Sequence, residues 1–149
     1  ALYSEAKQYW DKDPYVIHGE QGIRAYLLSA MIREAFNLVD CGYATVQDID
    51  RACRNDAGYY LPFAGNLRYM DLMGTKNYAE VMKELNRELS KRSALPDFFH
   101  KMIDSEALGM EEGNGFYEYE EGEAERWNEL FDKFSYQIRD IIRKYPFNP

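Results

Sequence analysis

The sequence predicts an all-α, multi-helix domain, and three observations lead to that fold class. Apolar residues recur at intervals of three and four along several stretches, which is the spacing of an amphipathic helix. Glycine and proline separate these stretches. The chain has 149 residues, of which 46% are hydrophobic and 15% aromatic. That composition supplies the core of one ordinary domain and is too apolar for a disordered segment.

Each predicted helix carries its own boundary signals. A first helix begins near Ser4 and must end before Pro14, because the residue ahead of a proline is pushed out of the α region. Thr45 and Asp48 have the spacing of a capping box, which predicts a helix start at Val46. A turn is expected at residues 58–62. The expected helices are residues 4–12, 23–41, 46–53, a stretch within 61–73, 75–89, 97–108 and 123–145.

One short segment near the N-terminus differs from this helical pattern. Tyr15, Val16 and Ile17 are residue types that favour strands, and Pro14 and Gly19 bound them. The sequence therefore predicts a short N-terminal strand at residues 15–17. Nothing else in the chain offers it a partner strand, so it is an orphan.

The last predicted helix has a broad apolar stripe. Seven apolar residues lie on it: Trp127, Leu130, Phe131, Phe134, Ile138, Ile141 and Ile142. A helix this long presents more apolar surface than the rest of a small domain covers, so a helical partner is expected. We therefore predict a homodimer formed through helices.

Charge and cysteine content exclude several function classes. The net charge of −8 argues against nucleic acid, which requires a surface of lysine and arginine. No apolar run approaches the roughly 20 residues that a bilayer span needs, so no membrane partner is expected. Cys41 and Cys53 show no CxxC spacing and predict two buried free thiols, no metal site and a cytoplasmic location.

Motifs for cofactors and catalysis are missing from the sequence. It contains neither the GxGxxG dinucleotide fingerprint nor a GxxxxGK[ST] phosphate loop, so no cofactor is expected in this chain. His18 and His100 have no neighbouring carboxylate in sequence and are interpreted as structural or surface residues. The acidic run at residues 118–125 is interpreted as a favourable helix start. No catalytic residue is predicted.

Four ordered segments resemble one known family. They are DKDPYVIHGEQG at residues 11–22, REAFNLVDCGYATVQDID at 33–50, LPFAGNLRYMDLMG at 61–74 and SEALGMEEGNGFYEY at 105–119. Together they are similar to the C-terminal helical domain of the 3-hydroxyacyl-CoA dehydrogenase family, including its lambda-crystallin-like branch. In the last segment Gly113 and Gly115 are expected to bend the chain through positive φ, and three aromatic residues to hold that bend on the core.

The resemblance has direct implications for the domain organisation. It implies a helical fold like that of the 6-phosphogluconate dehydrogenase C-terminal domain. Residues 1–21 would be the tail of a missing Rossmann domain plus a linker, and residues 22–149 the helical substrate and dimerisation domain. The family carries NAD and its catalytic histidine and glutamate in the Rossmann domain, so the resemblance implies NAD for that missing N-terminal part.

The resemblance also points to substrate-binding residues. The family places an asparagine and an arginine of a GFxxNR segment at the start of its long helix, and Ala25 and Tyr26 stand there in this sequence. Phe63, Gly65 and Asn66 are expected in a turn that faces the missing domain. These five residues are the predicted substrate-binding set. Alanine lacks the amide that would orient a substrate oxygen.

Three hypotheses for function remain at this point. The first is the C-terminal domain of an NAD-dependent 3-hydroxyacyl-CoA dehydrogenase-like oxidoreductase of fatty acid metabolism, with an acyl-CoA or hydroxy-acid substrate and no activity without its Rossmann domain. The second is a free-standing, non-catalytic helical dimerisation or interaction module. The third keeps the dehydrogenase but gives it a free 3-hydroxy acid as substrate.

Overall fold

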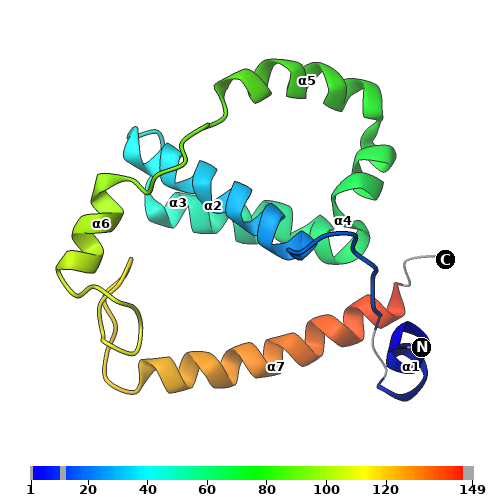
Figure 1. Ribbon diagram of the computed structural model, residues 1–149. Coiled ribbons are helices and arrows are strands. Elements are labelled where there is room, and N and C mark those ends of the chain that lie inside the picture. Colours follow the sequence, from blue (N-terminus) through cyan, green and yellow to red (C-terminus); the bar gives the residue numbers. More distant parts are fainter. Residues whose placement is uncertain (1, 11–12, 146–149) are drawn as a thin grey trace. The chain divides into compact units, whose positions relative to one another are not determined.

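The computed structural model describes residues 2–10 and 13–145, and within them it contains helices and no sheet (Figure 1). The all-α prediction is confirmed. The elements in chain order are α1 (Leu2–Tyr9), α2 (Ile23–Asp40), α3 (Val46–Ala52), a π-helical turn η1 (Cys53–Ala57), α4 (Gly58–Met73), α5 (Thr75–Glu88), α6 (Asp97–Asp104) and α7 (Glu123–Lys144).

The chain divides into two compact units, Ala1–Arg33 and Glu34–Pro149. The first unit contains α1 and the first half of α2. The predicted strand at residues 15–17 is wrong, because these residues form no regular structure. A strand is stable only when a neighbour pairs its backbone groups, and the described residues supply none. The first helix ends at Tyr9, and residues 11 and 12 of its predicted span lie outside the described residues.

In the second unit, the turn between α2 and α3 follows the sequence prediction. Gly42 adopts φ +72° after α2, a conformation that glycine reaches without a Cβ clash. Thr45 then caps α3 in a complete capping box, because its hydroxyl accepts from the Asp48 N–H and the Asp48 carboxylate accepts from the Thr45 N–H. The start of α3 at Val46 is therefore confirmed.

The predicted turn at residues 58–62 is wrong, because the chain stays helical there. The Gly58 N–H donates to the carbonyl of Cys53, so a π-helical turn leads from α3 straight into α4. Pro62 lies inside α4, and the break comes three residues later at Gly65, where φ is 69° and ψ is 178°. Gly74 ends α4 as predicted.

The remaining helices match the predicted ones with shifted ends. α5 begins at Thr75 after the N-cap residue Gly74, and no side chain caps the helix. Pro96 caps α6, which ends at Asp104 rather than near residue 108. Glu106 has φ +59°, which is incompatible with continuing a right-handed helix. α7 spans 22 residues, close to the predicted 123–145.

An aromatic cluster holds α2, α6 and the loop before α7 together. The Phe36 ring of α2 lies 4.8 Å from Phe99 and 6.1 Å from Phe116, and Phe98 meets it edge-on at 5.7 Å. Two polar contacts tie the segment after α5 to α2. The Ser90 N–H donates to Glu34 at 2.7 Å, and Arg92 pairs with Asp40.

Burial in this chain is low. Among the described residues only Ala64 and Pro96 are classed as buried. The prediction of buried thiols is wrong, since Cys41 and Cys53 are both free and exposed. No helix in the described part of the chain is both long and apolar enough to cross a bilayer.

Candidate functional site

The kink in α4 is the centre of the predicted substrate-facing segment. Pro62 lacks a backbone N–H, and its ring disfavours regular helix in the preceding turn. Gly65 then adopts a φ/ψ combination that is essentially restricted to glycine, and open space surrounds the position where a Cβ would lie. The glycine is therefore required by backbone conformation and not by crowding.

Two tyrosines bridge the kink. The rings of Tyr60, before the break, and Tyr69, after it, stack with centroids 4.2 Å apart and planes 7° apart. Burial raises the pKa of Tyr60, and the neighbouring Tyr78 of α5 and Asp56 act in the same direction. A half-buried, stacked tyrosine pair thus fixes the angle between the two arms of α4.

Phe63, Gly65 and Asn66 lie together at this kink. The Phe63 side chain is 52% exposed, so it is not a core residue, and its ring meets that of Tyr145 edge-on at 6.2 Å. Asn66 is exposed and begins the second arm of α4. The kink therefore exposes the Phe63 ring and the Asn66 amide on a backbone whose conformation Gly65 determines.

Ala25 and Tyr26 belong to the other unit, in the first turn of α2. The Ala25 N–H donates to the carbonyl of Gly22 at 3.0 Å, so this turn is closed by a backbone contact. The Tyr26 side chain is 68% exposed. The structure gives Ala25 no polar side-chain atom, so this position cannot orient a substrate oxygen.

The loop at residues 109–119 shows why its glycines occur where they do. Gly109 and Asn114 exchange both backbone hydrogen bonds, at 2.8 and 3.2 Å. A Cβ on Gly115 would lie 3.2 Å from the Cα of Gly109, so close approach of two backbones excludes a side chain there. Gly113 has φ +78°, as predicted. The positive φ predicted for Gly115 is wrong, and this glycine is needed for space instead. The sequence reading missed the role of Gly109.

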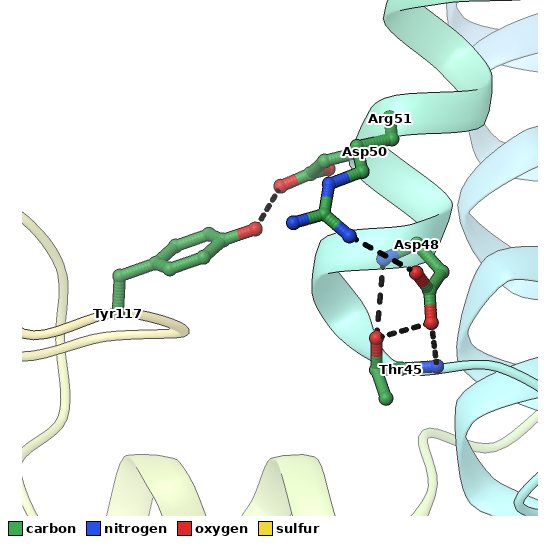
Figure 2. A network of polar contacts seen from close by, with 5 residues as sticks. All are labelled: Thr45, Asp48, Asp50, Arg51 and Tyr117. Carbon is green, nitrogen blue, oxygen red and sulfur yellow. Dashed lines mark hydrogen bonds and ion pairs between the residues drawn. The ribbon is translucent and has the colours of Figure 1, made fainter.

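Aromatic residues after the glycines anchor this loop. Phe116 stacks on Phe99 of α6 at 5.9 Å. The Tyr117 hydroxyl donates to Asp50 of α3 at 2.6 Å, and this bond raises the pKa of the tyrosine (Figure 2). The predicted anchoring of the bend is thus confirmed for Phe116 and Tyr117, while the ring of Tyr119, the third predicted anchor, lies 6.4 Å from that of Tyr117. No sequence signal indicated Asp50 as the partner.

The same close-up shows the cap of α3 beside that contact (Figure 2). The Thr45 hydroxyl donates to Asp48 at 2.6 Å, and Arg51 lies 3.4 Å from the same carboxylate. The bond from the Thr45 hydroxyl is the main reason why the pKa of Asp48 is lowered, followed by the Thr45 backbone N–H. Arg51 is a side-chain partner of Asp48, while the adjacent Asp50 accepts the hydrogen bond from Tyr117 of the loop.

A shallow hollow of about 480 Å³ lies between the loop and the start of α7. The loop contributes residues 108–112, including Glu111 and Glu112, and α7 contributes Ala124, Trp127, Asn128 and Phe131. The Trp127 indole N–H donates to Glu123 at 3.2 Å, which fixes the ring. The Glu123 carboxylate also accepts the N–H of Glu120, and that bond is the main cause of its lowered pKa.

The described residues contain no cluster of three or more histidine, cysteine or acidic side chains that could hold a metal ion. The chemistry that they offer is contact and orientation. Exposed rings and one amide lie at the α4 kink, and acidic side chains lie beside apolar ones at the loop.

The family described as "3-hydroxyacyl-CoA dehydrogenase, C-terminal domain" matches residues 23–119, well over half of the chain. The chain belongs to this family. The match begins at α2 and ends with the anchored glycine loop, so it contains the α4 kink and stops before α7. The resemblance suggested by the four sequence segments is therefore confirmed.

Curated relatives agree with this membership. The chain is 34% identical over 95 residues to 3-hydroxybutyryl-CoA dehydrogenase of Mycobacterium tuberculosis, covering 63% of this chain and 30% of that protein. It is 28% identical over 93 residues to 5-formyl-3-hydroxy-2-methylpyridine 4-carboxylate 5-dehydrogenase of Mesorhizobium japonicum, covering 62% and 30%. The alignments thus span less than a third of either relative.

A crystal structure of a 5-formyl-3-hydroxy-2-methylpyridine 4-carboxylic acid 5-dehydrogenase has the same fold as this chain. That protein is described as an NAD+-dependent dismutase, and the superposition gives a TM-score of 0.78 at 22% identity. It covers 83% of this chain and 40% of the other. At this identity the likeness supports the fold alone.

Proposed function

We propose that this chain is the substrate-side and dimerisation domain of an NAD-dependent 3-hydroxyacyl-CoA dehydrogenase-like oxidoreductase. The observation that carries the proposal is the family match over residues 23–119, which includes both the α4 kink and the glycine loop. The names of the aligned relatives, both dehydrogenases, support the reaction class.

A Rossmann domain would supply the part that this chain lacks. The sequence has no GxGxxG motif, and the alignments cover only 30% of each relative's length. We assign residues 1–21 to the end of that domain and its linker, and residues 22–149 to the helical domain. Bound NAD would accept the hydride there, and the helical chain alone would be inactive.

The role of the helical domain is to bind and orient the substrate. Phe63 offers an exposed ring for an acyl chain, and the Asn66 amide can both donate and accept a hydrogen bond. Gly65 holds both in place through its special backbone conformation. We also assign Ala25 and Tyr26 to substrate binding, with Ala25 making no polar contact.

Substrate choice follows from the same residues. An acyl-CoA thioester is the first choice because of the family. A free 3-hydroxy acid is the second, and Ala25 favours it, since the amide expected at this position in the family is absent. The Mesorhizobium relative is named for a pyridine carboxylate and not for a CoA thioester, which supports keeping a free acid as the second choice.

Dimerisation and location complete the proposal. The apolar residues of α7 are exposed, with Phe131 at 66% and Phe134 at 56%, which supports a homodimer. Free thiols at Cys41 and Cys53 support a reducing compartment, and we propose the cytoplasm.

The test uses the native gene product and this chain in parallel. The native protein should reduce NAD+ with 3-hydroxybutyryl-CoA or with free 3-hydroxybutyrate, and the chain of 149 residues should do neither. In the native protein Asn66→Ala should raise KM at least tenfold, with Asn86→Ala of α5 as the matched surface control. Turnover by the short chain would overturn the division of labour.

The non-catalytic alternative gives a different result in the same experiment. A native product with a mass near 17.5 kDa and no NAD+ reduction would identify a free-standing helical module. Equal KM values for the Asn66 and Asn86 variants would show that the α4 kink is not part of the substrate site, without contradicting the reaction class.

A further inference from the structure

The apolar stripe of α7 has the spacing of a coiled-coil seam. Six residues alternate in steps of four and three along the helix: Trp127, Phe131, Phe134, Ile138, Ile141 and Tyr145. Such alternation keeps one narrow face directed at a partner helix. Leu130 and Ile142 widen the face. The residues flanking the seam near its middle are the uncharged Ser135 and Gln137.

This seam is largely uncovered in the chain. Trp127, Phe131, Phe134, Ile141 and Tyr145 are between 47% and 66% exposed, and only Ile138 is half-buried. Tyr145 touches Phe63 of α4 with its ring edge and still exposes 57% of its surface. α7 also lies outside the residues that match the family.

The two ends of α7 differ in charge. Residues 123–129 at its start contain three glutamates and one arginine, whereas residues 139–145 at its end contain two arginines, one lysine and one aspartate. Two copies of α7 side by side in parallel would bring acidic end to acidic end. An antiparallel pair would bring each basic end to an acidic one, and like-charge contact is costly at an interface.

We propose that α7 docks on α7 of a second copy, antiparallel and around a two-fold axis near Ser135. In this register Phe134 of one copy packs on Ile138 of the other, and Phe131 packs on Ile141. The outer layer pairs Trp127 with Tyr145. The flanking residues that meet across the axis are Ser135 with Ser135 and Gln137 with Gln137, so no like charges face each other there.

The hollow beside α7 fits this arrangement. Trp127 and Phe131 form its apolar wall, and Glu111 and Glu112 line its other side. The basic end of the second copy, with Arg143 and Lys144 next to Tyr145, would enter it. The inference rests on the proposed homodimer and specifies which surface forms it and in which direction.

Cross-linking through single cysteines tests the direction. In a Cys41→Ser, Cys53→Ser background, Ser135→Cys should join two copies through a short bismaleimide, because both copies of residue 135 lie at the axis. Asn128→Cys should not, since the two copies would be about 24 Å apart along the helices at 1.5 Å per residue. Tyr136→Cys, on the opposite face of α7, is the matched control.

A second measurement keeps the test independent of cross-linking. Phe134→Asp should weaken the dimer at least tenfold by analytical ultracentrifugation, and Tyr136→Asp should leave it unchanged. Both side chains are exposed, so helicity by circular dichroism should stay the same for both variants.

Three other outcomes would contradict the proposed antiparallel pairing of α7. Cross-linking through Asn128→Cys would indicate a parallel pair and overturn the inference. If Phe134→Asp does not weaken the dimer and residue 135 does not cross-link, the interface lies elsewhere. That result would overturn the inference while leaving the proposed homodimer. A monomeric parent chain would overturn both, without affecting the dehydrogenase assignment.

Discussion

Two regions of the second unit are held in different ways. Residues 34–119 are tied by contacts between distant parts of the chain: Phe116 on Phe36, Ser90 on Glu34, Tyr117 on Asp50. α7 makes mainly local pairs, such as Lys133 with Glu129, and leaves its apolar residues exposed. The first region is therefore held by contacts within this chain, whereas the second leaves an apolar surface exposed.

Removing one aromatic ring from each region should give the largest difference in stability between the two regions. Phe116→Ala takes a ring from the aromatic cluster and should lower the free energy of unfolding by about 2 kcal/mol, less than a fully buried phenylalanine because Phe116 is 40% exposed. Phe134→Ala on α7 should change it by less than about 0.5 kcal/mol in dilute monomer. Urea denaturation measures both, and equal losses would refute the distinction.

The α4 kink offers a test of backbone strain. Gly65→Ala should cost about 1.5 kcal/mol, because alanine rarely adopts the φ/ψ values found there. Gly22→Ala is the control, since no atom lies within 4 Å of its Cβ position and its φ is not in the left-handed region. Thermal unfolding would separate them. A neutral Gly65→Ala would mean that α4 can straighten.

The cap of α3 gives a smaller effect with a defined pH dependence. Thr45→Ala should cost about 1 kcal/mol, whereas Thr75→Ala should cost little, because Thr75 makes no capping bond. The folded pKa of Asp48 is below its ordinary value of 3.8, so its contribution is present above that value and is lost as pH falls through the folded pKa. Urea denaturation from pH 6 down to pH 2 should show the free energies of unfolding of the parent chain and of Thr45→Ala converging as the pH falls. Parallel curves would exclude the Thr45–Asp48 bond as the cause.

The smallest expected effect concerns the loop anchor. The pKa of Tyr117 is raised above 10.0 by its bond to Asp50, so that bond stabilises the fold below pH 10 and is lost as pH rises through the folded pKa. Tyr117→Phe should lower the melting temperature slightly at neutral pH and remove this alkaline step. Tyr43→Phe, at 81% exposure, is the control. An unchanged ultraviolet titration of the Tyr117 variant would contradict the assignment.

Local signals made much of the fold predictable from sequence. The Thr45–Asp48 spacing and the glycines at 42 and 74 act within a few residues, so their effect did not depend on the rest of the chain. The break in α4 was not predictable, because Gly58, Pro62 and Gly65 are all helix breakers. In the structure Gly58 and Pro62 both lie within helix, and Gly65 alone of the three takes a non-helical conformation.

Contacts between distant residues were the harder part of the site. That aromatic residues anchor the glycine loop followed from the sequence, but Asp50 as the partner of Tyr117 lies 67 positions away and leaves no local pattern. The exposed thiols have the same origin. A cysteine within an apolar helical pattern suggests burial, and only the packing around α2 and η1 shows that nothing covers it.

The close approach of Gly109 and Gly115 has a consequence for how this sequence can vary. A Cβ at 115 would lie 3.2 Å from the Cα of Gly109, whereas Gly109 has room for a Cβ but a φ of +138°. An alanine at 115 would therefore require the facing backbone to move by a few tenths of an ångström, and an alanine at 109 would strain its own backbone. In an engineered library, substitutions at both codons should be depleted, for crowding at 115 and for backbone conformation at 109.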